Sequence, residues 1–307
     1  MRRPDHGELR TLRDWVRWGA SRFNEAGLFF GHGTDNALDE ALALALHALH
    51  LRHDLPADFL DARITREEAE AVVALFSQRV DRRIPAAYLT GEARFAGLDF
   101  HVDESVLIPR SPIAELIEEG FAPWLEAEQV TSVLDLCCGS GCIGIACAYA
   151  FPAALVDLSD ISPAALDVAI RNIERHQLED RVRALRADVY RGLDGERYDL
   201  IVSNPPYVST NEMRGLPQEY RHEPGIALEA GEDGMDVVAR ILVGGAEYLR
   251  PGGIMVVEVG ASAELLIGRY PDVAFLWLDF ERGGEGVFLL TAEQLNDYRD
   301  VFEEGRI

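Results

Sequence analysis

The sequence lacks a hydrophobic run long enough to cross a membrane. A transmembrane helix needs roughly 18 or more consecutive apolar residues, whereas the most apolar segment, residues 41–51, is shorter and contains His47 and His50. Its composition predicts a buried helix instead. No apolar segment follows the two arginines near the N-terminus, so neither a signal peptide nor a membrane anchor is expected. We therefore expect a cytoplasmic protein without a membrane partner.

Basic residues are also scarce. The 307-residue chain has 29 Lys and Arg residues against 53 Asp and Glu residues, which gives a formal net charge of −24. This charge repels a phosphate backbone, so direct binding of nucleic acid is not expected. It would attract a basic protein, although a surface adapted only for solubility has the same composition.

Cysteine is confined to one short segment, at Cys137, Cys138, Cys142 and Cys147. Crowded thiolates can hold a metal, but the spacing C-C-x3-C-x4-C lacks the paired C-x2-C arrangement of common zinc sites. A disulfide framework is equally unexpected, because nothing else in the sequence indicates an oxidising compartment. The segment also overlaps a glycine-rich loop that is a candidate ligand-binding site. We therefore expect no metal.

The chain is longer than one typical core of about 100–200 residues, which predicts one large domain and a smaller one. From residue 10 to 83 the apolar residues recur at helical spacing, for example at Leu12, Val16 and Ala20. The period changes to two over residues 93–102, which predicts a β-hairpin. The predicted domains are a helical substrate-recognition domain at 1–83, a β-hairpin linker at 84–108 and a larger domain at 109–307.

After Pro109, short apolar strands alternate with helices such as residues 163–176 and 236–249. This alternation predicts an α/β fold with a parallel, doubly wound sheet, in which ligands bind outside the carboxyl ends of the strands. Near the C-terminus, two strands around Gly283 and Gly284 predict an antiparallel hairpin. The predicted strands are residues 132–136, 154–158, 182–185, 198–202 and 254–258 in the sheet, and 275–278 and 286–290 in the hairpin.

The first strand of that sheet leads into a glycine-rich loop. Gly139, Gly141 and Gly144 satisfy the G-x-G-x-x-G fingerprint, which fits a nicotinamide dinucleotide as well as other nucleotide-like ligands. Glycines at this turn let a ligand approach the backbone closely. Asp135, just before the loop, would oppose a pyrophosphate but suits the cationic amino-acid end of S-adenosylmethionine. A purely structural turn is the alternative.

Acidic residues follow the next two strands. Asp160 ends the second strand, where a carboxylate can accept both hydroxyls of a ribose. Asp188 follows the third strand, where it can accept from an adenine amine. Either residue could instead only cap the following helix.

The fourth strand ends in Asn204-Pro205-Pro206-Tyr207. The two prolines fix φ and lack an N–H, so the loop is stiff and its carbonyls are free to accept. The Asn204 side-chain oxygen and the Pro205 carbonyl make two acceptors for one planar NH2 group, and Tyr207 offers an aromatic face to a flat amide or base. Binding both protons of an amide aims its nitrogen at a methyl donor. A tight turn without chemistry is the alternative.

With these residues in this order, the sequence resembles the class I S-adenosylmethionine-dependent methyltransferases. Residues 88–92, 107–110, 221–224 and 231–234 look like segments of the protein-(glutamine-N(5)) methyltransferase family. The resemblance implies a Rossmann-like, mostly parallel seven-stranded sheet and S-adenosylmethionine as the methyl donor. It implies that the target amide is held by Asn204, Pro205, Pro206 and Tyr207, and the cofactor by Asp135, Cys137, Gly139, Gly141, Asp160, Asp188 and Asn204.

Within that family, Arg110-Ser111-Pro112 and its surroundings are most similar to the branch that methylates a glutamine of the large-subunit ribosomal protein uL3. This implies a basic ribosomal protein as partner. Arg110, His222 and Glu223 are candidate substrate-binding residues. His222 and Glu223 could form an acid–base pair, but a hydrogen-bonded loop anchor is the stronger interpretation, and Glu258 has no assigned role.

Other functions remain open on the sequence alone. The same reaction on a glutamine of peptide release factors is the nearest alternative. Methylation of an adenine amine in nucleic acid is disfavoured by the net charge and the lack of a basic stripe. A nicotinamide oxidoreductase is disfavoured by the Asn204 to Tyr207 stretch. A non-catalytic module that kept the cofactor fold is the remaining alternative.

Overall fold

The computed structural model describes residues 8–193 and 195–305. Contacts between Cα atoms divide the chain into two compact units. Unit 1 comprises residues 1–93 and 217–222, and unit 2 comprises residues 94–216 and 223–307. The predicted domains at 1–83, 84–108 and 109–307 stay a prediction, and nothing in the sequence indicated that residues 217–222 return to unit 1. Within the described residues, no helix is both long and apolar enough to span a bilayer.

Unit 1 is built from helices whose first turns are fixed by side-chain caps. Thr11 and Thr65 each form a capping box with the acidic residue three positions on, and Asn36 caps the second helix. Such caps satisfy backbone N–H groups that have no partner within the helix. The helices bury a shared core that includes Trp15 and Phe76. They are α1 (Leu12–Glu25), α2 (Ala37–Ala48), α3 (Arg66–Arg82) and α4 (Ala86–Thr90), with the short turns η1 (Ala57–Asp61) and η3 (Gln218–His222).

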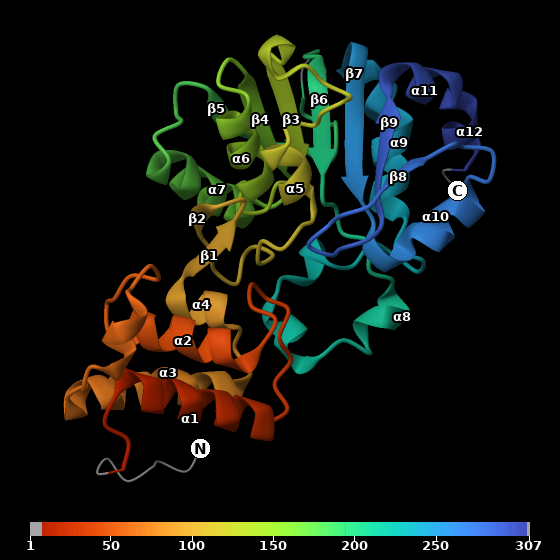
Figure 1. The fold of residues 1–307 in the computed structure, drawn as a ribbon. Helices are drawn as coiled ribbons and strands as arrows, with labels where there is room; N and C mark the ends of the chain where they lie inside the picture. The colour runs from red at the N-terminus through yellow and green to blue at the C-terminus, as the bar shows by residue number, and fades with distance from the viewer. Residues whose placement is uncertain (1–7, 194, 306–307) are drawn as a thin grey trace. The chain divides into compact units, whose positions relative to one another are not determined.

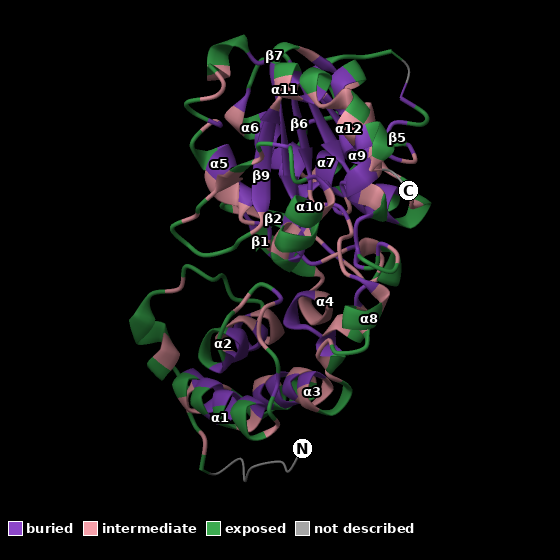
Figure 2. Cartoon of the chain, turned by 90° about the vertical axis from the view of Figure 1, so that its right-hand side faces the viewer, coloured by how far each residue is buried: buried purple, intermediate pink, exposed green. Residues whose placement is uncertain are grey.

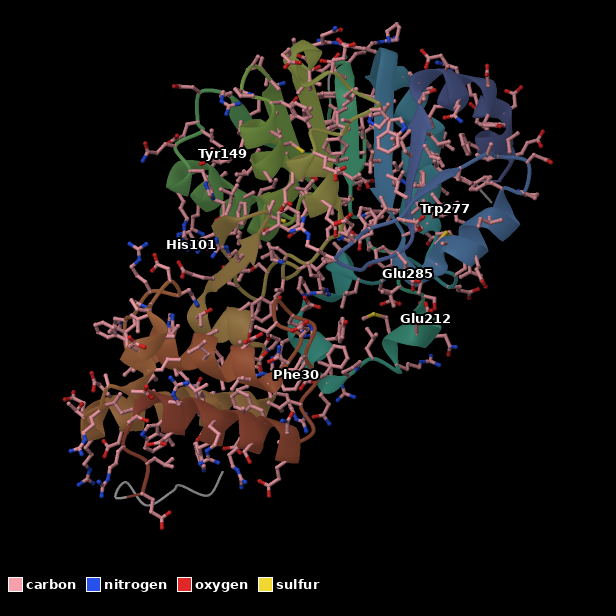
Figure 3. The ribbon with its side chains drawn as sticks, in the orientation of Figure 1. Phe30, His101, Tyr149, Glu212, Trp277 and Glu285 are labelled. Carbon is pink, nitrogen blue, oxygen red and sulfur yellow. The ribbon has the colours of Figure 1, made fainter. Side chains whose placement is uncertain are left out.

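A buried ionic network holds η3 in unit 1. The Arg79 side chain, 1% exposed, donates from Nε to Glu40 Oε1 at 2.6 Å and from Nη1 to Glu219 Oε1 at 3.3 Å. Its Nη2 also donates to the carbonyl of Phe29 at 2.8 Å. The guanidinium carbon lies 6.0 Å from the ring centre of Phe30, which is labelled in Figure 3. Arg79 therefore connects two helices, the loop after α1 and the returning segment.

The charge state of Glu219 follows from this network. Burial by itself would raise the pKa of the carboxyl group. The hydrogen bond from the Phe29 N–H and the hydrogen bond and charge of Arg79 outweigh that effect, so the pKa of Glu219 lies below its usual value. Glu219 is therefore an anion in the folded protein.

Unit 2 contains the central sheet, in the strand order β5-β4-β3-β6-β7-β9-β8 (Figure 1). The pairs from β5 to β7 are parallel, and β9 is antiparallel to both β7 and β8. The predicted doubly wound, mostly parallel seven-stranded sheet is therefore confirmed. Its strands are β3 (Ser132–Leu136), β4 (Leu155–Asp160), β5 (Val182–Arg186), β6 (Tyr198–Ser203), β7 (Leu249–Glu258), β8 (Leu276–Leu278) and β9 (Val287–Thr291). The predicted hairpin before the sheet is also present, as β1 (Glu92–Phe95) and β2 (Leu98–His101).

Helices cover both faces of the sheet, because successive residues of a strand point to opposite sides. Val133 belongs to one hydrophobic cluster and Leu134 to the other, and Leu200 and Ile201 divide in the same way. Figure 2 shows the buried strands between exposed helix surfaces. One face carries α5 (Ile113–Glu118), α6 (Cys142–Ala150) and α7 (Pro163–Arg175), and the other carries α9 (Asp236–Tyr248), α10 (Ala263–Arg269), α11 (Ala292–Asp297) and α12 (Arg299–Glu304).

One strand starts earlier than the sequence predicts. β7 begins at Leu249 and runs through a Pro-Gly-Gly stretch that reads as a helix end followed by a turn. A Cβ placed on Gly253 would lie only 2.9–3.1 Å from the backbone oxygens of Tyr198, Asp199 and Arg250. The glycine is needed because two backbones approach closely at a register shift between β6 and β7.

Arg79→Ala is predicted to destabilise unit 1 by about 3–5 kcal/mol, because buried Glu40 loses its ion-pair partner and buried Glu219 keeps only Arg83. Urea unfolding followed by tryptophan fluorescence measures the effect, since Trp15 and Trp18 lie in the core of this unit. Arg66→Ala is the control: its ion pair with Glu70 is exposed, so the loss should stay below about 0.5 kcal/mol. Equal losses in the two variants would contradict the account.

Candidate functional site

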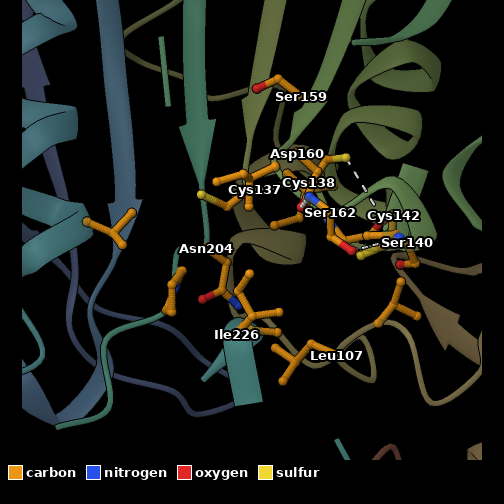
Figure 4. Close-up of a pocket in the computed structure, with 18 of the residues that line it drawn as sticks. Leu107, Cys137, Cys138, Ser140, Cys142, Ser159, Asp160, Ser162, Asn204 and Ile226 are labelled. Atoms are coloured by element: carbon orange, nitrogen blue, oxygen red, sulfur yellow. Dashed lines mark hydrogen bonds between the residues drawn. The ribbon is translucent and has the colours of Figure 1, made fainter. Parts of the chain in front are cut away.

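A cavity of about 210 Å³ opens at the carboxyl ends of the parallel strands. It is lined by the loops that follow β3, β4, β5 and β6, together with the segments around residues 105–111 and 226–229 (Figure 4). Asn204, Ile226 and Leu107 are among the lining residues labelled in Figure 4. The position is the one at which a doubly wound sheet binds ligands.

The glycine loop after β3 needs residues that tolerate a left-handed backbone. Cys137, Gly139 and Gly141 have φ values of +59°, +54° and +77°. A Cβ on Gly139 would meet no protein atom within 4 Å, so the space before it is open to a ligand. A Cβ on Gly141 or Gly144 would lie 2.8 Å or less from the Leu158 side chain. These two glycines let the loop and α6 pack against β4. Of the glycine-loop residues predicted to hold the cofactor, Cys137 and Gly139 line the cavity and Gly141 does not.

Asp160 ties this loop to the end of β4. Its Oδ2 accepts from the Gly139 N–H at 2.9 Å, and its Oδ1 accepts from the Ser162 N–H at 2.9 Å. Burial raises the pKa of Asp160, and these backbone hydrogen bonds offset part of the rise. Asp160 lines the cavity and retains lone pairs for further donors.

Asp188 has a cationic partner that sequence analysis missed. Arg240 on α9 contacts Asp188 Oδ1 at 2.6 Å, donates to the Asp188 carbonyl at 3.2 Å, and also lines the cavity. The sequence gives no signal for this pair, because the partners are brought together only by the packing of α9 on the sheet. The ion pair fixes the Asp188 carboxylate beside the cavity.

Asn204 is the first residue after β6, and it lines the cavity together with Pro206. Pro205 and Tyr207 do not line it. The Tyr207 hydroxyl donates to Glu258 Oε1 at 3.1 Å, and its carbonyl accepts from the Ser262 hydroxyl at 3.0 Å. The tetrapeptide therefore has one face toward the cavity and an anchored tyrosine beyond it.

Arg110 and Glu223 form a bidentate ion pair inside unit 2. The two Arg110 nitrogens lie 2.6 and 2.8 Å from the carboxylate, which also accepts from the Ile108 N–H at 3.0 Å. The Glu223 side chain is fully buried, and Arg110 lines the cavity. His222 belongs to unit 1, where its Nε2 lies 2.9 Å from the Arg82 carbonyl. These hydrogen bonds fit the interpretation of Glu223 and His222 as loop anchors. Substrate binding by Arg110, His222 and Glu223 stays a prediction.

Asp135 lies behind the loop rather than at the cavity surface. Its side chain is fully buried, does not line the cavity, and accepts from the Gly144 N–H at 2.8 Å through Oδ2. Burial raises the pKa of Asp135 to about 8, a rise that the Gly144 hydrogen bond opposes and the charge of Asp160 supports. At neutral pH the carboxyl group therefore carries a proton in most molecules. Its predicted role in cofactor binding stays a prediction.

All four cysteines are free, and three of them, Cys137, Cys138 and Cys142, line the cavity. Burial raises the pKa of each thiol above its usual value, and of Cys142 to about 12. The sulfur atoms are therefore thiols and behave as small apolar groups. Over residues 8–193 and 195–305, no group of three or more His, Cys, Asp or Glu side chains is placed to hold a metal ion.

The seven-stranded sheet, with antiparallel β9 between β7 and β8, has the fold of a class I methyltransferase. Residues 119–218 match the Methyltransferase small domain family. The fold is also that of the hMettl16 catalytic domain, solved in complex with a 3′UTR hairpin: the TM-score is 0.50 at 17% identity, over 73% of this chain and 80% of that one.

Three relatives are similar over nearly their full length, and each is named a ribosomal protein uL3 glutamine methyltransferase. The protein of Xanthomonas campestris is 53% identical over 94% of this chain and 93% of its own. That of Bordetella pertussis is 48% identical over 96% and 100%, and that of Francisella tularensis 46% identical over 96% and 95%. The chain belongs to the family of ribosomal protein uL3 glutamine methyltransferases.

The raised pKa of Asp135 predicts a pH dependence of stability. Folding favours the protonated carboxyl group, so its contribution is fully present below the unfolded pKa near 3.8 and is lost as pH rises toward about 8. The free energy of unfolding of the cofactor-free protein should therefore fall over this range. Asp135→Asn cannot titrate and should remove this part of the slope, as urea unfolding at several pH values can measure. If the free energy of unfolding depended on pH in the same way in the wild type and in Asp135→Asn, the prediction would be wrong.

Proposed function

We propose that the chain transfers a methyl group from S-adenosylmethionine to the side-chain amide nitrogen of a glutamine in ribosomal protein uL3. The observation that carries the proposal is the placement of Asn204 directly after β6, at the edge of the cavity. Membership of the uL3 methyltransferase family supports the reaction and the substrate. A ribosomal protein as substrate also agrees with the expected cytoplasmic location.

The residues around the cavity fit S-adenosylmethionine. Gly139 leaves open space where a ligand can approach the backbone. Asp160 has lone pairs for ribose hydroxyls, and the fixed carboxylate of Asp188 can accept from an adenine amine. When bound, S-adenosylmethionine supplies a methyl group on a cationic sulfur. The thiols that line the cavity add an apolar surface without competing charge.

The chain's contribution to the reaction is to hold and orient the target amide. An amide nitrogen is a poor nucleophile because its lone pair is delocalised. The Asn204 side-chain oxygen and the Pro205 carbonyl can accept both N–H groups at once, which fixes the amide plane. The same acceptors favour loss of one amide proton to solvent as positive charge develops on the nitrogen. Tyr207 would support the flat face of the amide. This arrangement needs no strong general base.

The test compares three substrates with methyl-labelled S-adenosylmethionine: unmodified uL3, unmodified release factors and unmodified DNA. Label on one glutamine of uL3 is the expected result. Asn204→Ala should lower the rate by at least about 100-fold, because the amide nitrogen is then no longer aimed at the methyl group. Cofactor affinity measured by calorimetry should stay nearly unchanged. Asn211→Ala, at an exposed asparagine in α8 (Thr210–Met213), is the control and should keep full activity. Label in release factors would keep the reaction but change the substrate from uL3 to a release factor. Label in DNA would contradict the proposal that Asn204 holds a glutamine amide.

The charge of the chain supports a basic partner and lies mostly in unit 2. Unit 2 has 37 acidic against 16 basic residues, whereas unit 1 has 16 against 13. We propose that unit 2 attracts uL3 before the amide reaches Asn204.

The attraction predicts that kcat/KM on free uL3 falls as salt rises from about 0.05 to 0.5 M, because the Debye length shrinks over this range. A short uncharged peptide that contains the target glutamine is the control, and its kcat/KM should change little. A value for uL3 that is insensitive to salt would contradict electrostatic attraction.

A further inference from the structure

Glu258 is a buried carboxylate that neither the fold nor the proposed chemistry has used. It is the last residue of β7, and its neighbour Val257 pairs with Ser203 at the end of β6. Glu258 therefore lies beside the point where Asn204 leaves the sheet. Only 7% of the residue is exposed, and it does not line the cavity.

The two carboxylate oxygens of Glu258 each accept from a different loop. Oε1 accepts from the Tyr207 hydroxyl at 3.1 Å, and Oε2 accepts from the Ser111 hydroxyl at 2.5 Å. The Ser111 oxygen in turn accepts from the Ile113 N–H at 3.2 Å, which directs its proton toward Glu258. Ser111 lines the cavity beside Arg110. One buried side chain thus connects the cavity wall with the tetrapeptide.

Tyr207 is confined on its other sides as well. A Cβ on Gly260 would lie 2.9–3.1 Å from the ring carbons and hydroxyl of Tyr207, so the ring lies directly on that backbone. A Cβ on Gly234 would lie 2.3 Å from the Tyr207 carbonyl oxygen, which also accepts from Ser262. The packing fixes the plane of the ring, and the hydrogen bond to Glu258 fixes its hydroxyl end.

We propose that Glu258 is a positioning residue for methyl transfer, which holds the Tyr207 ring and the Ser111 segment in the arrangement that orients the target amide. The proposal rests on the proposed function, because it takes Tyr207 as the support of that amide. Glu258 acts through Tyr207 and Ser111 and does not contact the reacting atoms. A displacement of about 1 Å in such a support can cost on the order of 100-fold in rate.

The proposal predicts a loss in kcat with little change in cofactor binding. Glu258→Ala should lower kcat on uL3 about 30- to 100-fold and leave the Kd for S-adenosylmethionine within about threefold. Glu258→Gln is the conservative variant, because its amide oxygen can still accept from Tyr207 and its NH2 group can donate to the Ser111 oxygen. It should restore kcat to within about fivefold of the wild type. Glu264→Ala, at an exposed glutamate of α10, is the control and should match the wild type.

A double-mutant cycle separates positioning from general damage. Tyr207→Phe keeps the ring but removes the donor, and it should lower kcat about 5- to 20-fold. The double variant Tyr207→Phe, Glu258→Ala should be little worse than Glu258→Ala alone, because both changes remove the same hydrogen bond. If Glu258→Ala does not fold, the kcat values of Glu258→Gln and Tyr207→Phe can still be compared with that of the wild type.

Three outcomes would overturn the proposal. The kcat of Glu258→Ala could lie within twofold of the wild type, or the losses in kcat of the two single variants could add fully in the double variant. Cofactor affinity could also fall in parallel with kcat. Failure of the proposed function itself is distinguishable, because the wild-type protein would then not label uL3 at all. With an active wild type, each outcome of the cycle bears on Glu258 alone.

Discussion

The parallel pairing of β3 with β4 and β6 is the constraint on which the site depends. Leu136 is the register partner of both Ser159 and Ser203, so three strands end at the same level of the sheet. The Ser203 hydroxyl donates to the Leu136 carbonyl at 2.7 Å. This side-chain hydrogen bond adds to the backbone pairing between the ends of β3 and β6. The glycine loop, Asp160 and Asn204 therefore leave the sheet side by side. Residues far apart in the sequence become one site because parallel strands present their carboxyl ends at one edge.

Beyond that edge the loops have no ladder of backbone hydrogen bonds, and carboxylates that are wholly or partly buried accept hydrogen bonds from them instead. Asp160 accepts from the glycine loop, Glu223 from Ile108 and Arg110, and Glu258 from Tyr207 and Ser111. Each carboxylate accepts at least two hydrogen bonds, which offsets the cost of removing it from water. Part of the acidic excess of the chain is thus structural and serves to hold loops. The remainder lies on the surface, where it can act on a partner.

Much of the fold could be predicted from the sequence, because the signals for it are local. The period-two strands, the cap at Thr65 and the glycine loop each lie within a few residues. The position of Asn204 at the cavity follows from its place directly after a parallel strand. β7 was predicted too short, since a Pro-Gly-Gly stretch reads as a turn unless the close approach of its neighbour is known.

The partners of the site residues could not be predicted in this way. Arg240 pairs with Asp188 and Glu258 with Tyr207 across more than fifty residues, and nothing near either member signals the other. At Asp135, burial raises the pKa of the carboxyl group, an effect that its position in the sequence does not reveal. Which residues face a cavity, and which support those that do, depends on packing between elements.

Unit 1 is built from two stretches of sequence, because residues 217–222 return to it. Arg79 is encoded with the helices and Glu219 far downstream, yet each satisfies the other's buried charge. Recombination that exchanged only the first 93 residues between relatives would separate the two partners. Unit 1 is therefore not a continuous segment, and its transfer without residues 217–222 would leave the charge of Arg79 without Glu219.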